Sequence, residues 1–242
     1  MEAPTMEQFD SRGQYDSISY RTVAEEKQKF LARTYGWMAL ALAISAASAF
    51  FTSQSITLLQ LIFGNRFGFW IIAIGELALV WWLSASIRKI SVAAATVAFI
   101  AYSLLNGLTL SAIFIVYTHT VIAYTFLASA GMFGAMALYG MKTKQNLTAA
   151  GRYLIMALWG IIFASLLNFL FKSSQLDWII SLVTVVVFIG LTAYDSQKIL
   201  AAAGYADGSD TFKKASISGA LELYLDFINI FLALLRLFGR RR

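Results

Sequence analysis

The chain has 242 residues, of which 59% are hydrophobic and only 13% are charged, and its mean hydropathy is +0.69. Soluble domains carry about half apolar and a quarter charged residues, so the composition predicts a polytopic membrane protein. The absence of cysteine excludes disulfides and thiolate catalysis, and the single histidine excludes two-histidine zinc motifs. The formal net charge of +6 is typical of basic loops beside lipid headgroups and does not require a nucleic-acid partner.

Residues 1–29 are polar and charged, and they are predicted to form a flexible N-terminal tail without a cleavable signal peptide. Residues 30–242 are predicted to form one all-α transmembrane domain of seven helices, because a span needs about 20 mostly apolar residues. The apolar segment 56–63 is too short to span and is predicted to lie along the membrane surface. The predicted spans are residues 33–52, 68–87, 91–116, 120–141, 152–171, 178–199 and 218–238.

Lysine and arginine residues divide unequally between the two ends of these spans. With a cytoplasmic N-terminus, the outside loops hold only Arg66 and Lys172, and the inside segments hold many more basic residues. This asymmetry predicts a cytoplasmic N-terminus. Arg236 and the arginines at 240–242 do not fit, since they would lie outside if all seven segments cross.

Two aspartates interrupt the sixth and seventh predicted spans. At a rise of about 1.5 Å per residue, Asp195 lies roughly 8 Å and Asp226 roughly 12 Å from the cytoplasmic end, so antiparallel neighbours would bring them to similar depth. Two carboxylates in reach of each other share a proton and titrate as one unit. The pair is therefore a candidate pH sensor and gate and, once deprotonated, a candidate calcium site. The alternative for Asp195 is an acid that reaches the headgroups from a helix end.

Three further charged residues belong to this hypothesis. Glu222 lies one turn before Asp226 and either extends an ion pathway or reaches the membrane interface. Glu76, in the second span, either lines the same pathway or makes a buried polar contact with an asparagine. Arg88 could lock a closed gate through a salt bridge to the aspartates, although a basic residue at a helix end also serves as a simple membrane anchor.

Several segments resemble the Bax inhibitor-1 family, also called the transmembrane BAX inhibitor motif family. The most specific are "AYDSQK" and "LYLDFIN", and the resemblance runs from Arg33 to Gly239. It implies a seven-helix fold with a central last helix, in the bacterial inner-membrane branch. It also implies a pH-dependent calcium leak gated by an aspartyl pair on helices six and seven, which falls on Asp195 and Asp226. The family's acidic residue on helix two falls on Glu76, and its arginine near the end of that helix falls on Arg88.

The favoured hypothesis is a pH-sensitive, calcium-permeable leak channel in a bacterial inner membrane. It needs no cofactor, and its partners are the lipid bilayer, calcium ions and protons. The alternative is a regulator without channel activity that binds a membrane protease or a stress-response protein through residues 1–29 and 200–217. No enzyme is expected: His119 lies in a predicted loop, and neither aspartate has the glycine-rich context of an intramembrane aspartyl protease.

Overall fold

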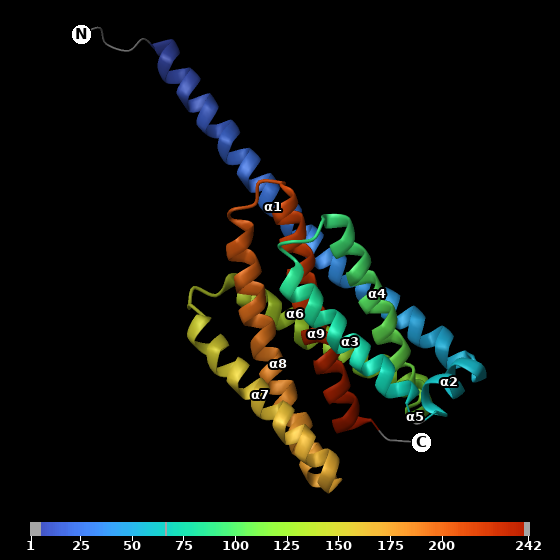
Figure 1. Ribbon diagram of the computed structural model, residues 1–242. Helices are drawn as coiled ribbons and strands as arrows, with labels where there is room; N and C mark the ends of the chain where they lie inside the picture. Colours follow the sequence, from blue (N-terminus) through green and yellow to red (C-terminus); the bar gives the residue numbers. More distant parts are fainter. Residues whose placement is uncertain (1–5, 66, 240–242) are drawn as a thin grey trace.

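The computed structural model describes residues 6–65 and 67–239, and this part of the chain contains helices and no strand, which confirms the all-α class. Its helices form one bundle, from which the first helix projects (Figure 1). In chain order they are α1 (Met6–Gln54), α2 (Ile56–Phe63), α3 (Gly68–Ser86), α4 (Val92–Leu110), α5 (Ala112–Val116), α6 (His119–Lys142), α7 (Thr148–Phe171), α8 (Ser174–Ala203) and α9 (Asp210–Phe238).

Six helices of the described chain are long and apolar enough to cross a membrane, and they match the first six predicted spans. The third of these spans joins α4 and α5, which are separated by Ser111. The predicted seventh span coincides with α9, which is not among the six. The six are Val23–Gln54, Gly68–Ser86, Val92–Val116, His119–Lys142, Thr148–Phe171 and Ser174–Ala203.

The predicted N-terminal tail is largely helical in its backbone, because α1 begins at Met6 and continues to Gln54 without a break. Figure 1 shows its first turns well outside the bundle. The flexibility expected of the tail stays a prediction. Residues 1–5, Arg66 and the terminal arginines at 240–242 lie outside the described part of the chain.

Local sequence explains where several helices begin. Ser55, Ser91, Thr118 and Ser173 stand immediately before α2, α4, α6 and α8, and each side-chain oxygen accepts a hydrogen bond from the amide three residues later. Such caps satisfy amides that have no partner inside the helix. The cap at Thr118 makes His119 the exposed first residue of α6, so its predicted place in a loop was wrong by one residue.

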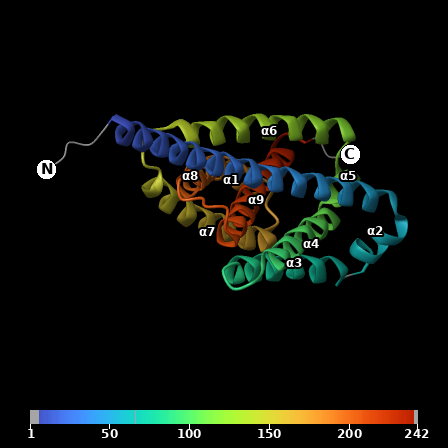
Figure 2. The same cartoon turned by 90° about the horizontal axis from the view of Figure 1, so that it is seen from above.

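Helix α9 packs against α1, α4, α6 and α8, and buried residues occur along it from Ser216 to Leu235. Seen from above, it lies between these helices (Figure 2). Helices α6 and α8 lie close together at Gly140, where an added Cβ would collide with the carbonyl oxygen of Ala193. Glycine at this position therefore allows the backbones to touch, as small residues do between membrane helices.

Candidate functional site

The two aspartates lie on neighbouring helices, Asp195 eight residues before the end of α8 at Ala203 and Asp226 near the middle of α9. Asp195 is half-buried on α8, and Asp226 on α9 is only 3% exposed. Asp195 is among the charged groups that act electrostatically on Asp226, together with Glu222 and Lys198. The structure thus brings the two carboxylates into one electrostatic neighbourhood, while their action as a gate stays a prediction.

Asp226 has an unusual environment for a carboxylate. Its Oδ2 atom is buried and has no hydrogen-bond partner. The hydroxyl of Thr192 lies beside it, but that hydroxyl donates its single proton to the carbonyl of Phe188 at 2.8 Å. A buried acceptor without a donor costs about 1–3 kcal/mol, and more when it is charged. The site therefore has an energetic need for a proton or a cation.

Glu222 forms an ion pair with Lys198 across the contact between α8 and α9. The Lys198 Nζ to Glu222 Oε1 distance is 2.8 Å, and the two side chains are 50% and 34% exposed. An ion pair this exposed contributes at most about 1 kcal/mol to stability. It places a cation and an anion beside the aspartates, and both act electrostatically on Asp195.

Glu76 contacts an asparagine, Asn106, which is one of the two roles that the sequence predicted for it. It accepts a hydrogen bond from Asn106 Nδ2 at 3.4 Å, and its Oε1 lies 3.0 Å from the Thr109 hydroxyl, whose single proton it shares with the Asn106 carbonyl at 2.9 Å. Asn106 Oδ1 in turn accepts a bond from the hydroxyl of Tyr224 at 2.8 Å, and that hydroxyl lies 2.6 Å from Ser45 Oγ.

This chain of hydrogen bonds joins four helices, since Glu76 is on α3, Asn106 on α4, Tyr224 on α9 and Ser45 on α1. Tyr224 and Ser45 are almost fully buried, at 0% and 1% exposure. Tyr224 stands two residues before Asp226, so the network links α3 to the segment of α9 that carries the aspartate. A role of Glu76 in an ion pathway stays a prediction.

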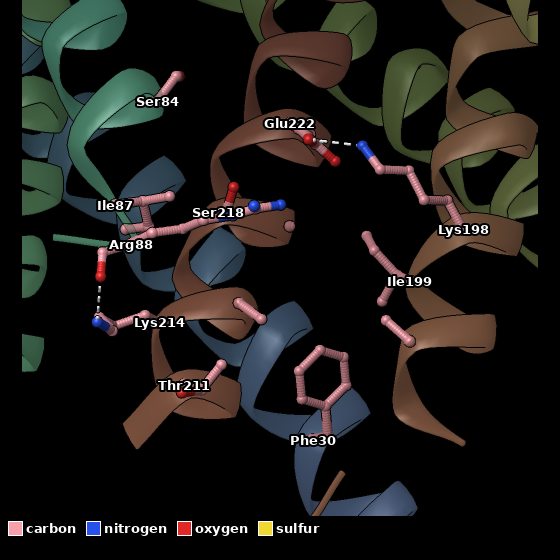
Figure 3. Close-up of a pocket in the computed structure, with 13 residues that line it drawn as sticks. Phe30, Ser84, Ile87, Arg88, Lys198, Ile199, Thr211, Lys214, Ser218 and Glu222 are labelled. Carbon is pink, nitrogen blue, oxygen red and sulfur yellow. Dashed lines mark hydrogen bonds and ion pairs between the residues drawn. The ribbon is translucent and has the colours of Figure 1, made fainter. Parts of the chain in front are cut away.

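Arg88 does not reach the aspartates: in the described residues its guanidinium forms no ion pair with either of them. It lies in a pocket of about 790 Å³ at the end of the bundle, between α3, α8 and α9. Figure 3 shows the Arg88 side chain passing beside Ser218, and the pair of Glu222 and Lys198 at the pocket's edge. The closed-state lock remains untested.

Sequence reasoning missed Lys198 and Tyr224 as parts of this region. Lys198 follows Asp195 by three residues, a spacing that puts both on one face of a helix and that could have indicated the electrostatic effect of Lys198 on Asp195. Tyr224 gave a weaker signal, because an aromatic residue in an apolar span usually contributes only packing. Within the described residues, no group of three or more His, Asp or Glu side chains is arranged to hold a metal ion.

Comparison with known proteins identifies the family of the chain. The family model described as "Inhibitor of apoptosis-promoting Bax1" matches residues 27–242. The chain is 51% identical to the inner membrane protein YbhL of Escherichia coli K12 over 217 residues, which cover 89% of this chain and 93% of that protein. It is 46% identical to an uncharacterized protein of Borreliella burgdorferi (89% and 94% covered) and 38% identical to one of Deinococcus radiodurans (93% and 96% covered). The chain is therefore a multi-pass membrane protein that belongs to the Bax inhibitor family.

Proposed function

We propose that the protein is a pH-sensitive, calcium-permeable leak channel of a bacterial inner membrane, gated by Asp195 and Asp226. The observation that carries the proposal is the buried Oδ2 of Asp226, which has no partner although a second carboxylate and an ion pair act on the same group. A proton shared by the aspartates would satisfy this atom in a closed state. Loss of the proton would leave an anionic oxygen site suited to a hard cation.

Calcium is the permeant ion in this proposal and not a resident ligand. Two carboxylates supply only part of the six to eight oxygens that calcium prefers, and water would supply the others during passage. Glu76 would line the route further into the bundle, and Glu222 would stand at its mouth. The inner-membrane location rests on the name of the Escherichia coli relative.

The proposal takes α9 as a seventh span at the centre of the bundle. Its 29 residues extend roughly 43 Å at about 1.5 Å per residue, more than the ~30 Å hydrocarbon layer. Its polar residues then face other helices and not lipid, which agrees with its contacts to four helices.

The same proposal places the N-terminus in the cytoplasm. Its support is the concentration of basic residues at the end of the bundle that holds the loops after α3, α6 and α8, because such residues gather on the cytoplasmic side. At the opposite end, the described residues include Lys172 and Arg236. The basic residues at the first end include Arg88, Lys89, Lys142, Lys144, Arg152, Lys198, Lys213 and Lys214.

The experiment is a flux assay on purified protein in calcium-loaded vesicles between pH 5 and pH 8. We expect a pH-dependent leak that Asp195→Asn and Asp226→Asn each alter, with Asp207→Asn as a control that removes an exposed acid outside the bundle. Unchanged flux and an unchanged pH profile in both variants would show that the gate is assigned wrongly.

A second candidate function is a regulator that binds another membrane protein. The observation in its favour is the length of α1, whose 49 residues are more than twice the ~20 that a span requires. Deletion of residues 6–22 separates the two functions. A channel keeps its vesicle flux after the deletion, whereas a regulator loses its cellular effect.

A further inference from the structure

The pocket beside Arg88 carries an inference that does not depend on ion conduction. Three basic side chains line it, from Arg88, Lys198 and Lys214, against one acidic side chain, Glu222. The acid is already neutralised by Lys198 at 2.8 Å. The remaining positive charge of Arg88 and Lys214 favours an anion in this part of the pocket.

Arg88 is the group in the pocket with unused donors. In the described residues its guanidinium makes no hydrogen bond and no ion pair to protein, although it carries five N–H donors in a planar fork. The fork matches two oxygens of a phosphate group. Hydroxyls of Ser84, Thr211 and Ser218 also line the pocket, and Figure 3 shows Ser218 beside the Arg88 side chain, where its hydroxyl can donate to the same phosphate.

Lys214 holds Arg88 in place. Its ammonium donates to the backbone carbonyls of Arg88 at 3.0 Å and Ile90 at 3.1 Å, which fixes the turn after α3 against α9. Figure 3 shows this contact on the α3 side of the pocket, with the Arg88 side chain extending from it. Lys214 is therefore a positioning residue, and Arg88 is the group that would touch the ligand.

The surroundings of the pocket favour a ligand with an apolar part. Phe30, Ile87 and Ile199 line the pocket together with its polar groups. Helix α3 packs mainly against α4 and α2 and contributes Leu83 as its buried residue, so lipid reaches most of its surface. Arg88 follows the last residue of this span by two positions, which is the level of the lipid headgroups.

We propose that this pocket binds a phosphate group, and that the group is the headgroup phosphate of an anionic phospholipid from the surrounding membrane. Basic pockets between membrane helices bind anionic headgroups by this chemistry. The phosphate occupies the fork of Arg88 and the nearby hydroxyls, and the glycerol and first acyl carbons lie on the apolar wall. A free phosphate ester would use the same polar groups without the apolar contact.

The test measures lipid binding to the purified full chain in detergent, by native mass spectrometry and by thermal stabilisation. The probes are phosphatidylglycerol, phosphatidylcholine and the soluble headgroup glycerol 3-phosphate. Loss of a bidentate arginine contact should weaken apparent phosphatidylglycerol binding by about tenfold or more in Arg88→Gln. The matched control is Lys89→Gln, which removes a charge from the adjacent exposed residue that does not line the pocket.

Selective loss in Arg88→Gln, with Lys89→Gln unchanged, supports the proposal. Equal binding by Arg88→Gln and the unmodified chain overturns it, as does equal binding of phosphatidylcholine, whose headgroup has no net charge. Equal stabilisation by glycerol 3-phosphate overturns lipid as the carrier of the phosphate. If Arg88→Gln does not fold, Arg88→Lys decides, because it keeps the charge, lacks the fork, and should still bind less tightly. Ion flux is not measured, so failure here is separate from failure of the channel proposal.

Discussion

Substitution of Asp226 by asparagine should make the protein more stable. The buried Oδ2 of Asp226 has no donor, and three charged groups lie close enough to act on it. Asparagine keeps the shape and removes the charge. Because an unsatisfied buried acceptor costs about 1–3 kcal/mol, we expect the free energy of unfolding to rise by roughly that amount.

The assay is thermal unfolding in detergent at pH 7, followed by the fluorescence of the six tryptophans. For a chain of this length, 1 kcal/mol corresponds to about 2–4 °C, so Asp226→Asn should raise Tm by roughly 2–12 °C. Glu25→Gln removes an exposed acid of α1 and should leave Tm within about 1 °C, as expected for a surface substitution. A Tm for Asp226→Asn equal to or below that of the unmodified protein would refute the reasoning, because the aspartate would then have a partner that stabilises it.

Three other predictions concern the hydrogen-bond network, the helix contact and the loop after α8. Tyr224→Phe removes a buried hydroxyl with two hydrogen-bond partners and should lower the free energy of unfolding by about 1–3 kcal/mol; an unchanged chemical denaturation midpoint would contradict the network. Gly140→Ala should lower Tm because the added methyl group forces α6 away from α8. The control Gly131→Ala, whose added methyl group meets nothing within 4 Å, should leave Tm equal or higher. A lower Tm for Gly131→Ala than for Gly140→Ala would refute the contact. Hydrogen bonds from the Ser209 hydroxyl and amide hold the pKa of Asp207 below its ordinary value. The bonds are therefore fully formed at a pH above the ordinary pKa, and they are lost as the pH falls through the lowered pKa. In a carbon NMR titration Ser209→Ala should raise the pKa of Asp207, and an identical titration curve would count against the bond.

The sequence was most informative where one physical requirement dominated. Runs of about 20 apolar residues are hard to explain in any other way, so the first six spans were predicted with boundaries that differ by at most four residues, except the start of the first span, which lies ten residues earlier, at Val23. The antiparallel connection between α8 and α9 also predicted that Asp195 and Asp226 would share a depth, and the structure has them within electrostatic reach.

The rotation of each helix about its axis could not be predicted. In a membrane both the lipid-facing and the protein-facing sides of a helix are apolar, so the periodicity that orients a soluble helix is weak. For this reason the sequence did not show that Glu222 would meet Lys198, that Tyr224 would meet Asn106, or that Arg88 would point into a pocket away from the aspartates.

Helix α3 is held in the bundle with far fewer buried side chains than α9. Glu76 bonds it to α4 near its middle, and Lys214 bonds the turn that follows it to α9, while Leu83 is its buried side chain. Breaking these few hydrogen bonds would free one wall of the bundle and uncover Leu83, which belongs to the apolar core. The hydrophobic penalty of detaching α3 is therefore set by this one buried side chain and by the half-buried Leu79 and Val80 that pack against the core.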